Sequence, residues 1–333
     1  MNTGEPKKVL VTGAGGFIGS HLARDQLAKG RAVVAIDVDL GRLNSMNLQG
    51  QLTCEQLDIR AVEKIRPLLE HVDVVFHLAA AHLDVLKDED YFFDVNARAT
   101  GDFVRIASEA GVARFVHCST VGVYGPLQSL PANEDTPPNP DIPYERSKLA
   151  GERAVRDAAS ECGLSTVIIR PAWVYGPLCP RTLKLIRTVA RKRFFYVGDG
   201  SALRHPIYIS DMLEAFELAA TRELPPCEAI IAAGPDTVSV KQLVEGIVDE
   251  LGMDFRPITV PTWFMHAACL GVEKLAGLVG REPPFSRRSL KFFSDSSAFE
   301  VTKAERLLAF TPKVSTREGL TQTISYYREK GIL

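Results

Sequence analysis

The 333-residue chain lacks the features that mark several protein classes. Its six cysteines are scattered and include no CxxC pair, so neither a metal cluster nor a disulfide framework is expected. Neither sign of charge dominates: 39 basic and 41 acidic residues give a net charge of −2, which provides no basic surface for a nucleic-acid partner. We therefore expect reduced thiols, no metal, no nucleic acid and a cytoplasmic location.

The sequence also lacks an uninterrupted apolar run long enough to cross a bilayer. The most apolar late stretch is 261–280, PTWFMHAACLGVEKLAGLVG, which is interrupted by His266, Glu273 and Lys274. We interpret it as an amphipathic helix packed on the protein, and contact with a membrane surface or an apolar substrate stays an open alternative. No signal-peptide core precedes VLVTG at 9–13, so no membrane insertion is expected.

Short apolar runs alternate with helical stretches in the first half of the chain. The pattern predicts strands at 7–12, 31–37, 51–58, 72–80, 113–119 and 165–171. It predicts helices at 17–30, 61–70, 89–110 and 144–163. Because strands alternating with helices form βαβ units with right-handed crossovers, we expect the α/β class and a Rossmann-type, doubly wound parallel sheet.

The alternation weakens after about residue 171, where helical stretches dominate. We expect helices near 181–193, 211–221, 239–252, 262–280 and 315–330. The predicted division is a Rossmann domain over 1–170, with a return segment at about 206–232, and a smaller, mostly helical substrate-binding region. That second region would consist of 171–205 and 233–333.

Three glycines, Gly13, Gly16 and Gly19, lie between the first predicted strand and the first predicted helix. Glycines allow a tight turn there and let a pyrophosphate approach the backbone. The first-turn N–H groups near Phe17 and Ile18 would face that anion. The spacing is GxxGxxG, and the sequence predicts a dinucleotide site, with a ligand-free tight turn as the alternative.

Asp37 ends the second predicted strand, eighteen residues after Gly19. A carboxylate at this place accepts hydrogen bonds from an adenosine ribose and repels a 2′-phosphate, so we expect NAD rather than NADP. Arg42 lies close enough in sequence to weaken that preference. The alternative for Asp37 is a simple turn acid at the end of a strand.

Tyr144 and Lys148 are four residues apart at the start of a predicted helix, just after Pro143. This spacing puts both side chains on one helix face. A nearby ammonium favours the phenolate form of a tyrosine, which can then exchange a proton with an alcohol oxygen. A solvated helix face is the common alternative for an isolated YxxxK.

The motifs occur in one order: TGAGGFIG, Asp37, LDIR at 57–60, HLAA at 77–80, VNARAT at 95–100, STVGVYG at 119–125 and YERSK at 144–148. In this order they closely resemble the extended short-chain dehydrogenase/reductase family, which includes nucleotide-sugar epimerases and dehydratases and 3β-hydroxysteroid dehydrogenase-like enzymes. The resemblance covers nearly the whole chain and continues through 170–177, 197–212 and 299–314. It also implies a homodimer formed through helices that include 144–162.

The resemblance implies roles for individual residues. Tyr144 would be the acid/base, Lys148 would bind the nicotinamide ribose, and Thr120 would be the catalytic hydroxyl because it lies four residues before Tyr124. The substrate would contact His82, Thr120, Trp173 and Arg204. The cofactor would contact Gly13, Gly16, Phe17, Ile18, Gly19, Asp37, Arg42, Asp58, Ile59, Leu78, Ala79, Ala80, Asn96, Tyr144, Lys148, Pro171 and Val174.

The residues after Thr120 limit the reaction. Relatives that dehydrate a hexose resemble one another in having Asp and Glu there, and decarboxylating relatives keep the Glu. This chain has Val121 and Gly122, which cannot carry a proton, so both reactions are disfavoured. We expect hydride transfer at a secondary alcohol, first of all in a UDP-hexose type 4-epimerase acting on a nucleotide sugar.

Two alternatives remain from the sequence. One is a 3β-hydroxysteroid dehydrogenase-like or other NAD(P)-dependent alcohol dehydrogenase or ketoreductase, and the other is a non-catalytic NAD-binding sensor. Arg204 suits a substrate phosphate. Trp173 stands where many sugar-nucleotide enzymes have an asparagine, and with Trp263 and Phe264 it would suit an apolar pocket.

Overall fold

Seven short strands form one parallel sheet in the order β11-β6-β5-β4-β1-β2-β3. The computed structural model describes residues 5–82, 88–265, 267–269 and 293–333. Chain order reverses between β1 and β4, which creates the switch point where α/β sheets bind ligands, and the predicted doubly wound sheet is confirmed. Its strands are β1 (Lys8–Thr12), β2 (Ala32–Asp37), β3 (Leu52–Gln56), β4 (Val74–His77), β5 (Arg114–Cys118), β6 (Thr166–Pro171) and β11 (Glu228–Ala232).

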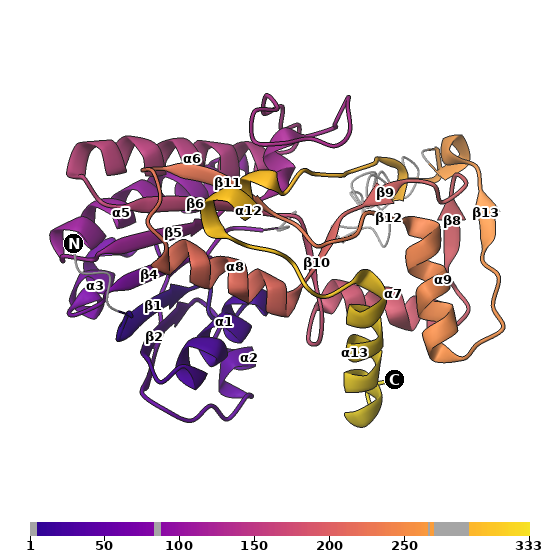
Figure 1. The fold of residues 1–333 in the computed structure, drawn as a ribbon, viewed down its shortest axis with the longest axis horizontal. Helices are drawn as coiled ribbons and strands as arrows, with labels where there is room; N and C mark the ends of the chain where they lie inside the picture. Colours follow the sequence, from indigo (N-terminus) through magenta and orange to yellow (C-terminus); the bar gives the residue numbers. More distant parts are fainter. Residues whose placement is uncertain (1–4, 83–87, 266, 270–292) are drawn as a thin grey trace.

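Helices cover both faces of this sheet (Figure 1). One face packs against α1 (Phe17–Ala28), α8 (Ile209–Thr221) and α12 (Thr302–Leu308). The other packs against α3 (Val62–Ile65), α5 (Ala99–Glu109) and α6 (Pro143–Cys162). Because both faces are covered, strands such as β6 are buried along their whole length, which explains why they are near-continuously apolar in sequence.

Two predicted helices have a different form in the structure. The stretch predicted at 61–70 is α3 followed by a 3₁₀ helix, η1 (Arg66–Leu69), because Pro67 has no N–H to continue the α-helical bonding. The stretch predicted at 89–110 is α4 (Glu89–Phe93), a π-helical turn η2 (Asp94–Arg98) and then α5. The π-helical turn holds the buried Asn96.

The rest of the chain forms a smaller region with α7 (Pro180–Ala190), α9 (Val240–Leu251) and α13 (Thr316–Glu329), which lies beyond the ends of β5 and β6 (Figure 1). Buried aromatic side chains, among them Tyr175, Tyr196 and Tyr208, fill its core. Short strand pairs that the sequence did not predict brace this region. These are β7 (Trp173–Tyr175) with β10 (Pro206–Tyr208), β8 (Phe195–Val197) with β13 (Ile258–Val260), and β9 (Leu203–Arg204) with β12 (Val238–Ser239).

The predicted helix at 262–280 lies only partly within the described residues. Residues 262–265 and 267–269 are helical, and Trp263 and Phe264 on this segment are 73% and 52% exposed. Residue 266 and residues 270–292 lie outside the described part of the chain. Within the described residues, no helix combines the length and apolarity needed to span a bilayer.

Candidate active site

The glycine loop joins β1 to α1 at the switch point of the sheet. Gly13 has a φ of +69°, and a Cβ at this position would lie 2.7 Å from the backbone nitrogen of Ala79. A Cβ on Gly19 would lie 2.0 Å from the Gly13 oxygen. Phe17 and Ile18 form the first turn of α1, which has no acidic residue and no side-chain cap. The loop thus leaves its backbone accessible to a phosphate at a helix N-terminus.

Asp37 faces this loop from the end of β2. Its carboxylate accepts hydrogen bonds from the backbone nitrogens of Gly15 (2.9 Å) and Asp39 (3.1 Å). Steric limits also apply here, because a Cβ on Gly15 would lie 1.8 Å from the Asp39 oxygen. The acid predicted for the adenosine ribose and the glycines predicted for the pyrophosphate are therefore neighbours in space.

The other residues predicted around the adenosine are arranged less simply. Arg42 donates a hydrogen bond to the Leu178 oxygen at 2.6 Å, which ties the Rossmann sheet to the loop before α7. Asp58 pairs with Arg60 at 2.6 Å. The Ile59 side chain is buried in the core, so only the backbone of this residue could make the predicted contact with an adenine.

Residues after β4 form the next wall of the predicted groove. The backbone nitrogens of Leu78 and Ala79 donate to the Thr12 hydroxyl at 3.2 and 3.1 Å, while Ala80 follows in the same partly exposed segment. The buried Asn96 amide is bonded in both directions to Ala81. The same amide donates to the Ser147 hydroxyl at 2.8 Å, so Asn96 holds this segment against the start of α6.

The two adjacent hydroxyls at the end of β5 take different partners. Ser119 is buried and donates to a carboxylate oxygen of Glu152 at 2.6 Å. Thr120 is half-buried, and its hydroxyl accepts from the Gly122 nitrogen at 3.0 Å, which caps the 3₁₀ turn η3 (Val121–Tyr124). The structure therefore places Ser119 in the interior and leaves Thr120 as the hydroxyl at the surface of the strand end.

Tyr144 and Lys148 come from the first two turns of α6, which Pro143 starts. Lys148 is 1% exposed and its ammonium donates to the Cys118 oxygen at 2.7 Å, which fixes it beside the end of β5. Burial lowers the pKa of Lys148, and the nearby Cys118 and Glu152 act in the opposite direction. Tyr144 is half-buried, and its ring centroid lies 4.4 Å from that of His82.

Of the predicted substrate residues, His82 and Thr120 follow strands of the main sheet, whereas Trp173 and Arg204 lie in the smaller region. His82 is exposed beside Tyr144 and is also hydrogen-bonded to Arg181 of α7. Trp173 begins β7, shortly after Pro171 and just before Val174, and its ring stacks on Tyr175 with centroids 5.8 Å apart.

Arg204, the residue predicted for a substrate phosphate, is buried. Its guanidinium donates to the backbone oxygens of Leu203 (2.7 Å) and Asp295. Burial lowers the pKa of Arg204 to about 10, against a smaller raising effect of Asp295. In this structure its position is therefore fixed by backbone oxygens.

Sequence reasoning missed two carboxylates at this site. Glu152 lies four residues after Lys148 and binds Ser119, and that i, i+4 spacing on one helix face was a usable signal. Glu145 covers Gly122: a Cβ on Gly122 would lie 3.2 Å from a carboxylate oxygen of Glu145 and 3.3 Å from the Thr120 hydroxyl. The space left by a missing side chain at residue 122 is thus filled from α6.

Comparison with known proteins gives one consistent family. The model of the "NAD dependent epimerase/dehydratase family" matches residues 9–232. A UDP-glucose 4-epimerase of Mycolicibacterium smegmatis is 30% identical, with 97% of this chain and 99% of that protein aligned. A 3-beta-hydroxysteroid dehydrogenase of Mycolicibacterium neoaurum is 26% identical, covering 97% of this chain and 92% of its own. The crystal structure of a UDP-glucuronic acid 4-epimerase from Bacillus cereus in complex with NAD matches with a TM-score of 0.79 and 26% identity, covering 97% and 99% of the two chains.

Proposed function

Because the chain belongs to the NAD-dependent epimerase/dehydratase family, we propose that it is a nucleotide-sugar 4-epimerase of the UDP-hexose type. The observation that carries the proposal is the hydrogen bond from Lys148 to the Cys118 oxygen, which holds the start of α6, where Tyr144 lies, at the carboxyl end of β5, where Thr120 follows the strand. The similarity to a UDP-glucose 4-epimerase over nearly the full length of both chains supports the choice of substrate class.

The residues at the switch point fit NAD. The glycine loop has no room for a Cβ at Gly13 or Gly19, as expected where a backbone must approach a pyrophosphate, and Asp37 offers a carboxylate to a ribose diol. When bound, NAD supplies the acceptor and donor of the hydride. The family and the NAD-bound structural neighbour agree with this cofactor.

The chain's own residues handle the proton. Tyr144 takes the proton of the sugar 4-hydroxyl as the hydride leaves the same carbon, and returns it after the ketone has turned over. Lys148, fixed by the Cys118 oxygen, favours the phenolate form of Tyr144 and is placed to hold the nicotinamide ribose. Thr120 presents its hydroxyl to the reacting oxygen, while its neighbour Ser119 is engaged by Glu152.

Dehydration requires a proton donor as well as a base, and neither of the two residues that follow Thr120 can supply one. Val121 carries no proton. Glu145 fills the space over Gly122, but it is a single carboxylate supplied by α6. Release of a 4-keto-6-deoxy sugar from a nucleotide hexose would contradict this part of the proposal.

Replacing Tyr144 by Phe tests the proposal directly. Loss of the acid/base group should reduce interconversion of UDP-glucose and UDP-galactose by at least about 100-fold, while NAD stays bound. Interconversion is measured by separating the two nucleotide sugars, and bound NAD by its release on denaturation. Tyr326→Phe on the distant α13 is the matched control and should leave turnover unchanged. Near-normal turnover of Tyr144→Phe would reject the assignment.

A second candidate is a 3β-hydroxysteroid dehydrogenase-like oxidoreductase. It is favoured by the burial of Arg204 against backbone oxygens and by the exposed rings of Trp263 and Phe264. An epimerase must retain NAD through each turnover, whereas a dehydrogenase must exchange it. Reduction of added NAD by a hydroxysteroid, without any epimerisation of nucleotide sugars, would replace the first proposal by this one.

A further inference from the structure

The chain after α7 carries a group of basic side chains. No acidic residue occurs from 162 to 198, although the whole chain has a net charge of −2. Arg191, Lys192 and Arg193 follow the last turn of α7 and are all exposed. Arg256 is exposed as well and comes two residues before β13. We call these four residues the basic cluster.

The pairing of β8 with β13 brings the basic cluster together. The two strands are parallel, with Phe195 opposite Ile258, so Arg193 and Arg256 both lie at the same end of the strand pair. None of the four side chains forms an ion pair with a described residue. Asp254 is the carboxylate closest to Arg256 in sequence, and it is exposed. The cluster therefore keeps a net positive charge at the surface.

Two aromatic rings are exposed at the other end of the same strand pair. After β13, Met265 and Cys269 pack with Val197 of β8 in a small buried cluster, which fixes the inner side of this segment. Trp263 and Phe264 lie outside that cluster and are 73% and 52% exposed. Their ring centroids are 5.9 Å apart, with an angle of 87° between the planes. Adjacent exposed rings of this kind indicate a surface that meets a partner.

A partner that contacts both ends of the strand pair must be extended. Arg256 and Trp263 are seven residues apart, which is roughly 20 Å along a strand. Ile258 lies between them and is 71% exposed. Figure 1 shows β8 and β13 at the end of the smaller region that lies away from β1 and β2 of the main sheet. A small ligand cannot reach both the basic cluster and the rings, whereas a membrane surface can.

An anionic bilayer matches the chemistry of this surface. Each Lys or Arg near an anionic lipid surface strengthens binding about fivefold. Tryptophan is favoured at the level of the lipid headgroups. Exposed Phe and Ile side chains gain free energy when they leave water for the boundary between headgroups and acyl chains. Basic residues and apolar residues on one edge of the protein are thus satisfied by the same surface.

Other partners fit this surface less well. A nucleic acid has a phosphate beside every base, so its binding sites interleave basic and aromatic residues. Here β13 separates the basic cluster from the rings. A second copy of the chain, related by a twofold axis through the rings, would bring both basic clusters into one interface, where they repel each other.

We propose that this end of the smaller region, formed by the basic cluster, Ile258, Trp263 and Phe264, docks on an anionic lipid surface. The inference goes beyond the proposed function, because the docking surface includes none of the residues assigned to catalysis. It holds for either reaction proposed above, and it places the enzyme at a membrane surface through side-chain contacts alone.

Sedimentation with vesicles tests the inference on the full chain. Vesicles of phosphatidylcholine alone are compared with vesicles in which about one third of the lipid is phosphatidylglycerol. The wild type should bind the anionic vesicles at least about 10-fold more strongly, because the basic cluster meets a negative surface. Salt at about 1 M, where the Debye length is about 3 Å, should remove most of this preference.

The triple variant Arg191→Gln, Lys192→Gln and Arg193→Gln tests the basic cluster. It should weaken binding to the anionic vesicles by at least about 10-fold and leave binding to the neutral vesicles unchanged. Retention of NAD and an unchanged denaturant midpoint show that the variant is folded.

A second triple variant is the matched control: Arg24→Gln, Lys64→Gln and Arg306→Gln. These are exposed residues of α1, α3 and α12, around the main sheet. The control removes the same charge from elsewhere on the molecule, so it should change binding to the anionic vesicles less than about threefold.

Tryptophan emission reports on the aromatic end. The chain has two tryptophans, the half-buried Trp173 and the exposed Trp263. On anionic vesicles the wild-type emission should shift to shorter wavelength as Trp263 leaves water. Trp263→Phe should still bind, because it keeps an apolar ring, but without the shift. Replacing Trp263 and Phe264 together by Ser should weaken binding at least about 10-fold.

Three results would overturn the inference: no preference for anionic vesicles, an equal loss of binding in the two triple variants, or no shift in the emission of Trp263. Tighter binding to a single-stranded oligonucleotide than to vesicles would assign the surface to a nucleic acid instead. A halved molecular mass of the double Ser variant in solution would assign it to a second copy of the chain. Turnover of Tyr144→Phe tests the proposed function separately, so the two can fail independently.

Discussion

Two carboxylates, Glu152 and Glu217, are each bound by an arginine. Glu152 lies beside the predicted site residues, whereas Glu217 lies between two helices away from them. Glu152 is fully buried behind the end of β5 and receives two hydrogen bonds from Arg170, at 2.8 and 2.6 Å, and one from Ser119. Arg170 also donates to the Tyr124 hydroxyl at 2.7 Å. This cluster holds the segment that carries Thr120 against the helix that carries Tyr144 and Lys148.

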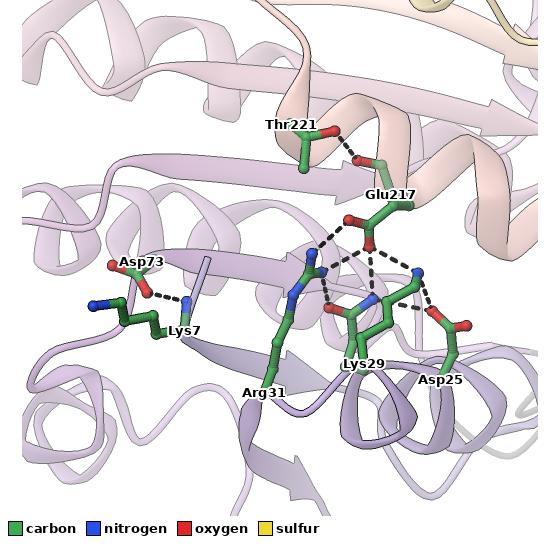
Figure 2. Close-up of polar contacts among 8 residues, drawn as sticks. Lys7, Asp25, Lys29, Arg31, Asp73, Glu217 and Thr221 are labelled. Carbon is green, nitrogen blue, oxygen red and sulfur yellow. Dashed lines mark hydrogen bonds and ion pairs between the residues drawn. The ribbon is translucent and has the colours of Figure 1, made fainter. Parts of the chain in front are cut away.

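Glu217 lies on α8 and receives hydrogen bonds from Arg31, Gln26 and Lys29 around the end of α1 (Figure 2). Its side chain keeps 19% exposure, whereas that of Glu152 has none. Figure 2 shows the donors converging on Glu217, and Asp25 shares the Lys29 ammonium. This cluster joins two helices on one face of the sheet and includes none of the predicted site residues.

The comparison separates two uses of a similar interaction. A buried pair that is broken leaves an uncompensated charge in the interior, whereas a partly exposed pair can be solvated. The Glu152 cluster therefore couples stability to the geometry of the site, and the Glu217 cluster contributes to stability alone.

Arg170→Met should give the largest effect, because it leaves Glu152 buried with Ser119 as its main partner. We expect a loss of about 3–5 kcal/mol in the free energy of unfolding. Turnover should also fall, since Ser119 and Tyr124 flank the segment of Thr120. Chemical denaturation and assays of the folded fraction measure the two effects.

Arg156→Gln is the control for that experiment. It removes a more exposed arginine that approaches Glu152 only at 3.4 Å, so its cost should stay below about 1 kcal/mol. If Arg170→Met unfolds no more easily than Arg156→Gln, the buried pair of Glu152 and Arg170 does not stabilise the fold.

Glu217→Gln should destabilise the protein by about 1–2 kcal/mol at neutral pH and leave turnover unchanged. Burial raises the pKa of Glu217, but hydrogen bonds from Arg31, Gln26 and Lys29 lower it more, from 4.5 to about 2. The depressed pKa stabilises the fold above pH 4.5, and this stabilisation is lost as the pH falls toward 2. Denaturation of both proteins at pH 7 and pH 3 should therefore show a smaller difference at pH 3, and a constant difference would contradict the pKa.

Much of this architecture was predictable because it is local in sequence. The alternation of strands and helices predicted the sheet, and Pro67 could have predicted the break after α3. The glycine loop and Asp37 were found by spacing, and the structure places them together. The short strands β7–β10, β12 and β13 have two or three residues each, too few for a periodic signal.

Contacts between distant segments were not predictable in the same way. Ser119 and Glu152 are 33 residues apart, and nothing in STVGVYG shows that its serine turns inward. The choice of Thr120 depended on a family resemblance, and the structure adds a physical reason for it. Arg181 and His82 belong to different regions, so only the folded chain brings them together.

The smallest expected effect on stability comes from replacing either of two stacked histidines, one with hydrogen-bond partners and one without them in the described residues. His77 and His117 are buried side by side with ring centroids 5.4 Å apart. His77 is hydrogen-bonded to Thr12 at 2.9 Å and to Thr100 at 3.0 Å, whereas neither ring nitrogen of His117 has a partner within the described residues. Burial lowers the pKa of both, to about 3 for His77, so both rings are neutral at physiological pH.

His117→Phe keeps a ring against His77 and removes two unsatisfied nitrogens from the interior. Since an unpaired buried polar atom costs free energy, we expect stability to stay constant or to rise by up to about 1 kcal/mol. His77→Phe removes one hydrogen-bond partner from each of two buried hydroxyls, those of Thr12 and Thr100, and should cost about 1 kcal/mol instead. Denaturant midpoints of the two variants measure the difference. A clear loss of stability in His117→Phe would show that His117 has a bonding partner, such as a buried water beside Lys148.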